Sequence, residues 1–275
     1  MLLKRVRKRI PPDAYNRAYL FSDYLEGYEE YKAGSLSFIK SKMLDMLALE
    51  EGDNYLELGL GRGEFIRHCA ERGARVKGID YSRDVVEVSR EALREFPDAD
   101  IRLAECNDIP FESDSFERVF AGDVIEHLCY KDALLMLREM YRVLKPGGFM
   151  LIHTAPNTLF VKWVYPVTRH FLKLINKDVV ETIDYQLKVG RRLHIYEYNL
   201  LTLRGIAKRA GLGRAEVWMD GDILRSGKHR FTQDLNRNPL VRFTGLCGRF
   251  SLIRFFLGND LYLKCYKGDA GLLSD

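Results

Sequence analysis

The chain has 275 residues, of which 47% are hydrophobic and 30% are charged. This composition is typical of a soluble globular protein with room for one large α/β domain and a modest lid. Because no run of about 18 apolar residues occurs, a membrane-spanning helix is excluded. Five of the first ten residues are basic, and they lead to Pro11 and Pro12 rather than to an apolar stretch, which excludes a signal peptide.

The five cysteines and six histidines are scattered along the chain, and no two cysteines form a CxxC pair. An odd, dispersed set of cysteines indicates a reducing compartment, so we expect a cytoplasmic protein whose cysteines act as small hydrophobic residues. The same scatter argues against a structural zinc site. We therefore predict that the protein holds no metal.

The net charge of +4 is unevenly distributed. The first ten residues contribute five positive charges and residues 224–256 a net six, so the remainder of the chain sums to −7. Two basic flanks on a mildly acidic body are typical either of a solvated surface or of attraction to an anion. The anion could be a phosphate group, a membrane surface or a nucleic acid.

Apolar spacing and the capping, glycine and proline residues between apolar runs predict alternating helices and strands. We expect helices over residues 35–49 and 63–72, from a Ser82 cap to Phe96-Pro97, through Ala133, Leu137, Met140 and Leu144, and over residues 200–210 between an Asn199 cap and Gly211. We expect strands over residues 54–58, 75–79, 99–103, 116–121, 149–153, 217–220 and 260–267. This alternation predicts an α/β fold with a parallel sheet covered by helices on both faces.

A glycine cluster, Glu57-Leu58-Gly59-Leu60-Gly61-Arg62-Gly63, lies where the first strand turns into a helix. Glycines there let the backbone approach a ligand, and the open helix amides attract negative charge. Asp80 follows the second strand, 23 residues after Glu57, where a carboxylate can bridge two ribose hydroxyls. A dinucleotide fold would prefer glycine at position 64, which here is Glu64, so the turn favours a cofactor without a pyrophosphate.

Five segments between Tyr55 and Ile152 read YLELGLGRGEF, GIDYS, AECNDIPFESDSFERVF, DVIEHL and RVLKPGGFMLI. In this order they resemble the motifs of the class I S-adenosylmethionine-dependent methyltransferases, closest to the branch with quinone-biosynthesis and surface-glycan enzymes. The resemblance implies S-adenosyl-L-methionine as cofactor and S-adenosyl-L-homocysteine as product. It also implies a Rossmann-like, doubly wound, mainly parallel seven-stranded sheet with a helical lid.

The resemblance further implies cofactor contacts for ten residues. Those expected around the methionine part are Glu57, Gly59, Leu60, Gly61, Gly63 and Asp123, and those expected around the ribose and adenine are Asp80, Tyr81, Glu105 and Cys106. Glu57 would hold the ammonium group, and Asp123 would lie near the point where the methyl group emerges. The family usually has Asp where this chain has Glu105, which puts that adenine contact in doubt.

Three histidines are candidates for the base that a hydroxyl acceptor would need. His127 lies in DVIEHL, where a packed structural role is the favoured interpretation. His153 ends the fifth strand, at the edge where open α/β sheets bind ligands. His194, which resembles a family histidine that faces the substrate cavity, is the favoured candidate.

The acceptor is expected to contact the variable segments, namely a basic and aromatic arm (residues 1–34) and a substrate lid (residues 157–198). These flank the cofactor-binding core (residues 35–156), and residues 199–275 complete the same domain. In the lid, Val167, Phe171 and Leu174 form an apolar stripe beside basic residues. We favour a helix that packs this stripe into the core over one that lies on an anionic membrane.

Three functions stay open. The favoured one is O-methylation of a small-molecule, glycan or lipid-linked acceptor. For this function, peripheral contact of the protein with an anionic membrane is one possibility. An RNA-modifying methyltransferase ranks lower, because the basic residues of the second flank are interleaved with apolar ones. A non-catalytic cofactor-binding relative ranks last, because the cofactor positions are intact. The sequence does not indicate an oligomeric state.

Overall fold

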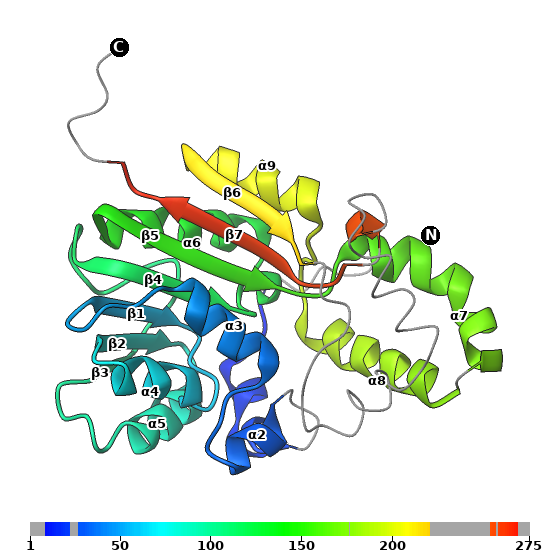
Figure 1. Cartoon of the computed structure of the whole chain (residues 1–275), viewed down its shortest axis with the longest axis horizontal. Helices are drawn as coiled ribbons and strands as arrows, with labels where there is room; N and C mark the ends of the chain where they lie inside the picture. Colours follow the sequence, from blue (N-terminus) through cyan, green and yellow to red (C-terminus); the bar gives the residue numbers. More distant parts are fainter. Residues whose placement is uncertain (1–8, 23–26, 176, 221–253, 257, 269–275) are drawn as a thin grey trace.

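The computed structural model describes residues 9–22, 27–175, 177–220, 254–256 and 258–268. Within this part of the chain, seven strands form one sheet in the order β3-β2-β1-β4-β5-β7-β6 (Figure 1). The strands are β1 (Asn54–Leu58), β2 (Arg75–Asp80), β3 (Asp100–Leu103), β4 (Phe116–Gly122), β5 (Leu144–Thr154), β6 (Arg214–Met219) and β7 (Leu261–Tyr266). β7 pairs antiparallel with β5 and β6, and all other pairs are parallel. The prediction of a mainly parallel seven-stranded sheet is confirmed.

Helices cover both faces of this sheet. The helical elements of the described residues are η1 (Pro12–Tyr15), α1 (Arg17–Leu20), α2 (Tyr28–Lys32), α3 (Phe38–Met46), α4 (Glu64–Glu71), α5 (Arg83–Ala92), η2 (Ile125–His127), α6 (Tyr130–Val143), η3 (Phe160–Val164), α7 (Tyr165–Ile175), α8 (Lys177–Leu193) and α9 (Leu200–Ala210). Helices α3, α4 and α5 contribute to the core on one face, and α6 and α9 to the core on the other. The doubly wound arrangement is therefore confirmed.

The central strand β1 shows how the sequence produces these two cores. Successive side chains of a strand point to opposite faces. Leu56 and Leu58 accordingly join the core that contains α6 and α9, while Tyr55 joins the core that contains α3, α4 and α5. All three side chains are fully buried, as expected for a strand with helices on both sides.

Two predicted helix starts differ from the structure. The helix expected over residues 35–49 is shorter, because the Ser37 hydroxyl caps it by accepting from the Lys40 amide at 3.4 Å. Ser82 occupies the N-cap position of α5 as predicted, but its side chain does not cap the helix. Its hydroxyl instead donates to the Tyr15 carbonyl at 3.1 Å and ties the N-terminal segment to the sheet edge.

Two other boundaries test the prediction in the second half of the chain. Leu144, expected on the helical stripe, begins β5 instead, because it pairs with Phe116 across the sheet. Asn199 caps α9 as predicted, with its side chain accepting from the amides of Leu201 and Thr202 at 3.0 Å. Gly211 ends the same helix in the left-handed conformation.

The segment between β5 and α9 forms a helical insertion. Helices α7 and α8 pack together through Asp184, which accepts from Arg169 at 2.5 Å and from the Tyr165 hydroxyl at 2.9 Å. Figure 1 shows this pair extending away from the end of the sheet. No helix of the described residues is long and apolar enough to cross a membrane.

The apolar stripe of α7 does not pack into the core. The exposed fractions are 79% for Val167, 62% for Phe171 and 87% for Leu174. The favoured prediction of a core-facing stripe is therefore wrong, because α7 packs on α8 through the opposite, polar residues Tyr165 and Arg169.

Candidate functional site

A cavity of about 430 Å³ lies at the C-terminal ends of β1, β2 and β4. This edge of an open α/β sheet is where ligands bind. Nine of the ten residues predicted to contact the cofactor line the cavity: Glu57, Gly59, Leu60, Gly61, Asp80, Tyr81, Glu105, Cys106 and Asp123. The remaining one, Gly63, lies outside the lining.

The three glycines of the turn have different tasks, although all have positive φ values. A Cβ on Gly59 would lie 2.3 Å from Val124 Cγ2, and one on Gly63 would lie 2.9 Å from the Ser89 Cα atom. Gly63 therefore allows α4 to pack closely on α5. Gly61 has no atom within 4 Å of its Cβ position, so its open side faces the cavity.

Glu57 presents a buried carboxyl group to the cavity. It is 3% exposed, and its Oε2 accepts from the Tyr55 hydroxyl at 3.0 Å. Burial raises the pKa of Glu57 well above its ordinary value, because the hydrogen bond from Tyr55 and the charge of Lys40 only partly offset the lost solvation. A ligand ammonium group would supply the missing positive charge, so this position fits the amino acid end of S-adenosylmethionine.

Asp80 joins the end of β2 to the glycine turn. Its Oδ1 accepts from the Ser82 amide at 2.8 Å and its Oδ2 from the Leu60 amide at 3.1 Å. Burial raises the pKa of Asp80 to about 6, although these amides partly offset it. Each carboxylate oxygen can accept a further hydrogen bond, so Asp80 fits two ribose hydroxyls.

The end of the cavity predicted for adenine is already engaged by the N-terminal segment. Arg9 forms an ion pair with Glu105 and lies over the Tyr81 ring, with its guanidinium carbon 5.4 Å from the ring centroid. The Tyr81 hydroxyl donates to the Ile10 carbonyl at 3.3 Å. Arg9 thus competes for the carboxylate that was predicted to accept from the adenine amine.

Sequence reasoning missed these cavity contacts of the N-terminal segment. Besides Arg9, the side chains of Tyr15 and Tyr19 line the cavity, and the Tyr15 hydroxyl lies 3.0 Å from His127 Nδ1. Aromatic residues in the arm were visible in the sequence, but they were assigned to the acceptor. Only the fold shows that the arm lies over the cofactor cavity.

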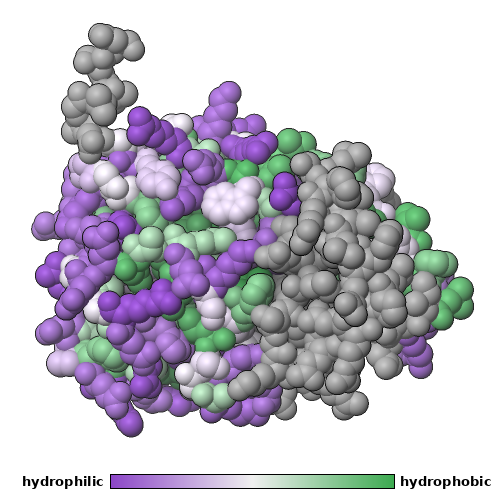
Figure 2. Space-filling model, in the orientation of Figure 1, coloured by the Kyte–Doolittle hydropathy of each residue, from purple (hydrophilic) through white to green (hydrophobic). Residues whose placement is uncertain are grey.

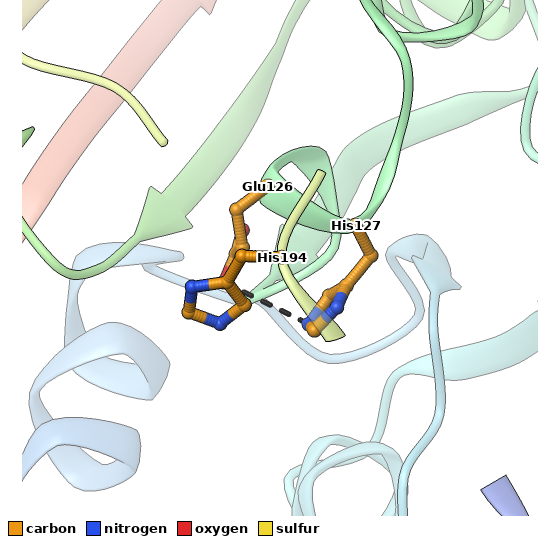
Figure 3. Close-up of side chains that lie close together, drawn as sticks. All are labelled: Glu126, His127 and His194. Carbon is orange, nitrogen blue, oxygen red and sulfur yellow. Dashed lines mark ion pairs between the residues drawn. The ribbon is translucent and has the colours of Figure 1, made fainter. Parts of the chain in front are cut away.

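Two of the candidate histidines meet in the fold. The ring centroids of His127 and His194 are 5.1 Å apart, and Glu126 lies beside both (Figure 3). Burial and the neighbouring His194 lower the pKa of His127 to about 4, so its imidazole is neutral. Burial alone would lower the pKa of His194, but Glu197 and Glu126 outweigh it and raise the pKa above its ordinary value.

Glu126 is a site residue that the sequence analysis did not select. It is 1% exposed, and burial together with the charge of Asp123 raises its pKa to about 8. The available signal was its position directly before His127, just after a strand that ends at the ligand-binding edge.

His153 lies in a different environment from the other two. Its Nδ1 is 2.9 Å from Asp123 Oδ1, and its Nε2 is 3.1 Å from Asp260 Oδ1. Burial alone would lower the pKa of His153, but the two carboxylates outweigh it and raise the pKa well above its ordinary value. Because a protonated imidazole cannot accept a proton, the geometry favours a positioning role for His153 over the predicted role as a base.

His153 also holds Asp123 in an unusual conformation. Asp123 follows β4 with a φ of +54°, in the left-handed region that favours glycine. Although the Asp123 side chain is 53% exposed, partial loss of solvation would raise its pKa, but the neighbouring His153 outweighs this and lowers the pKa below its ordinary value. Asp123 is therefore a fixed negative charge on the cavity wall.

A mainly parallel sheet with this strand order, a glycine turn and an acid after β2 that fits two ribose hydroxyls are the features of a nucleoside-binding α/β domain. The family described as "Methyltransferase domain" matches residues 56–152. YrhH of Bacillus subtilis, assigned as a methyltransferase, is 31% identical over 147 residues, covering 52% of this chain and 79% of that protein. The chain therefore belongs to the class I S-adenosylmethionine-dependent methyltransferases.

Further relatives support this assignment over part of their length. The ubiquinone/menaquinone biosynthesis C-methyltransferase UbiE of Geotalea daltonii is 32% identical, covering 44% of this chain and 53% of that protein. The chain spans about half or less of several such relatives. Phosphoethanolamine N-methyltransferase 2 of Haemonchus contortus, solved with S-adenosylhomocysteine, shares the fold with a TM-score of 0.59 at 20% identity, covering 90% of this chain and 60% of that one.

Proposed function

We propose that the protein transfers a methyl group from S-adenosylmethionine to a hydroxyl oxygen of its acceptor. The observation that carries this proposal is the group Glu126, His127 and His194, of which His127 lines the cofactor cavity. The names of the relatives include a C-methyltransferase and an N-methyltransferase, so family membership alone does not decide the acceptor atom. The local chemistry of this group supports a hydroxyl oxygen as the acceptor atom.

A hydroxyl acceptor must lose a proton, whereas a carbon or amine acceptor need not use a base. S-adenosylmethionine supplies an already activated methyl group when bound, so the protein mainly orients the reactants. Glu57 and Asp80 would fix the two ends of the cofactor. Neutral His127 lines the cavity beyond the glycine turn, next to Asp123, where it can contact the acceptor oxygen.

Among hydroxyl acceptors, the surface of α7 favours one that is carried by a lipid in an anionic membrane. Trp163, Val167, Phe171 and Leu174 recur at helical spacing and are all more than 60% exposed. Residues 157–177 contain four lysines and arginines and no acidic residue. Figure 2 shows hydrophobic residues at the edge of the molecule where α7 lies in Figure 1.

An exposed apolar stripe flanked by positive charge matches the interface of an anionic bilayer. Lys162 and Lys173 are exposed on the segment that carries the stripe, whereas Arg169 pairs with Asp184 and Lys177, at the start of α8, pairs with Glu181. Contact of α7 with the bilayer would bring the insertion and the cavity edge close to a lipid-borne sugar or quinone-like acceptor. The alternative of an RNA acceptor relied on the two basic flanks, residues 1–10 and 224–256, of which only 9–10 and 254–256 lie in the described part of the chain.

Methyl transfer from labelled cofactor into separated cell fractions tests the proposal. We expect the labelled methyl group in the membrane-lipid fraction. The labelled product should remain in this fraction after phospholipid, protein and RNA have been removed. Label in RNA, or in a water-soluble product alone, would contradict a lipid-borne acceptor.

A vesicle assay tests the membrane contact separately. The protein should bind vesicles with phosphatidylglycerol but not vesicles of phosphatidylcholine alone. Raising the salt from about 0.1 M to 1 M shortens the screening length from about 10 Å to about 3 Å and should weaken binding. Val167→Glu with Leu174→Glu should abolish it, and Leu201→Glu, at a leucine of α9 that is 63% exposed, should not. Equal binding by the α7 variant would overturn the role of this surface.

A further inference from the structure

Glu126, His127 and His194 surround a common point. Each offers one potential ligand atom, and these atoms lie within 4.8 Å of one another (Figure 3). Two imidazoles and a carboxylate are a donor set that binds divalent transition metals. With metal–ligand distances of about 2.0–2.2 Å, such atoms would lie about 3.3 Å apart, so small side-chain rotations would close the site.

The hydrogen bonds that these side chains make away from the common point are of the kind that orient metal ligands. His127 Nδ1 lies 3.1 Å from the Leu193 carbonyl and 3.0 Å from the Tyr15 hydroxyl, and in the tautomer that carries its proton on Nδ1 it can donate to the carbonyl. The Thr154 hydroxyl donates to Glu126 Oε2 at 2.9 Å. These contacts leave His127 Nε2 and Glu126 Oε1 facing each other at 4.0 Å. A histidine that donates its other nitrogen to a carbonyl is typical of metal sites.

His194 is connected to the other two residues by the backbone. The Glu126 carbonyl accepts from the Ile195 amide at 2.8 Å and from the Tyr196 amide at 3.1 Å. These bonds hold the end of the insertion against η2, which carries Glu126 and His127. His194 Nδ1 is buried without a hydrogen-bond partner, 3.6 Å from Glu197 Oε1.

The charges around the point also suit a cation. Glu126 is 1% exposed, and a buried carboxylate is costly unless it is paired. A divalent cation would supply the charge that this carboxylate lacks. The sequence-based expectation of no metal rested on the scatter of the histidines along the chain, which the fold reverses for His127 and His194.

We propose that Glu126, His127 and His194 bind a divalent transition-metal ion that acts on the acceptor hydroxyl. This role rests on the proposed O-methylation, whereas the binding itself does not. His127 also lines the cofactor cavity, so the ion would lie where the acceptor oxygen meets the methyl group.

A cation at this point lowers the pKa of a hydroxyl that coordinates it. The acceptor O–H bond breaks and its proton leaves to solvent. An oxygen lone pair forms the new O–CH₃ bond, and the S–CH₃ bond breaks with its electron pair passing to sulfur, which gives S-adenosylhomocysteine.

Metal binding to the purified, chelator-treated full chain tests the site. Electron paramagnetic resonance follows the binding of Mn²⁺, and competition with Mn²⁺ measures the binding of Zn²⁺. We expect about one ion per chain. His194→Ala and Glu126→Gln should each weaken binding at least tenfold, in line with the loss of a ligand. His68→Ala, which removes a histidine of α4 paired with Glu71, should leave it unchanged. No binding, or equal binding by all variants, would overturn the proposal.

Thermal unfolding and S-adenosylhomocysteine titration show whether each variant is folded. If His194→Ala is misfolded, His194→Gln takes its place. Activity then separates the two proposals. If the metal-free protein methylates its acceptor at the full rate, the role of the metal is wrong and O-methylation stands. If the metal binds but the product is methylated at carbon or nitrogen, O-methylation and the action of the metal on a hydroxyl are wrong, and only the binding site stands.

Discussion

Replacing Asp80 with asparagine tests the assignment of the cofactor cavity. Asp80 Oδ1 and Oδ2 each accept from one backbone amide, of Ser82 and Leu60 respectively, and each keeps one acceptor position for a ribose hydroxyl. In Asp80→Asn an NH₂ group takes the place of one oxygen. One ribose hydrogen bond is lost, and one buried backbone amide loses its acceptor.

A hydrogen bond to a charged group is worth about 1.5–3 kcal/mol. With a tenfold change for every 1.4 kcal/mol, the affinity for S-adenosylhomocysteine should fall about 10- to 150-fold. The unpaired amide should also lower the free energy of unfolding by about 1–3 kcal/mol. A loss of affinity in a protein that stays folded distinguishes a ligand contact from a purely structural residue.

Calorimetric titration at pH 8, where Asp80 is ionised, measures the affinity, and denaturant unfolding measures stability. Asp100→Asn is the matched control, because Asp100 lies on the neighbouring strand β3, pairs with Arg102 and does not line the cavity. A folded Asp80→Asn protein that binds within twofold of the parent would show that another group holds the ribose.

Three further predictions concern the glycine turn and Asp80. Gly61→Val should abolish S-adenosylhomocysteine binding in calorimetry, because the side chain would enter the cavity. Gly211→Val, at the end of α9, introduces a comparable positive-φ strain of about 1–3 kcal/mol and should bind normally. Gly63→Ala should lower the free energy of unfolding by about 1–3 kcal/mol in denaturant titration, because its Cβ would meet Ser89, and a neutral result would contradict the packing role. Because the bound ribose favours the ionised form of Asp80, whose pKa is about 6, affinity should fall as the pH drops below 6, and Asp80→Asn should flatten that part of the pH profile.

The parts of the site that are local in sequence could be predicted. The strand, the glycine turn and Asp80 lie within one βαβ unit, where strand ends and helix starts fix their positions. Nine of the ten residues implied by the family resemblance line one cavity. Gly63 was chosen for the same reason, but its neighbours show a packing constraint that no spacing rule reveals.

The parts that depend on tertiary packing could not be predicted. His127 and His194 are joined by backbone hydrogen bonds between η2 and the end of the insertion, so their sequence separation hides the contact. Arg9 reaches Glu105 only because the N-terminal segment crosses the cavity. The stripe of α7 has the spacing of a buried face, and periodicity alone cannot distinguish packing on a core from an exposed apolar surface.

The chemical shift of the transferred carbon tests the central claim most directly. The protein is incubated with S-adenosylmethionine labelled with ¹³C at the methyl group and with the membrane-lipid fraction, and the product is examined by nuclear magnetic resonance. The account predicts one new signal in the range of an O-methyl group, lost in Asp80→Ala and in Glu126→Gln. A labelled product with the shift of a C-methyl or N-methyl group would contradict it.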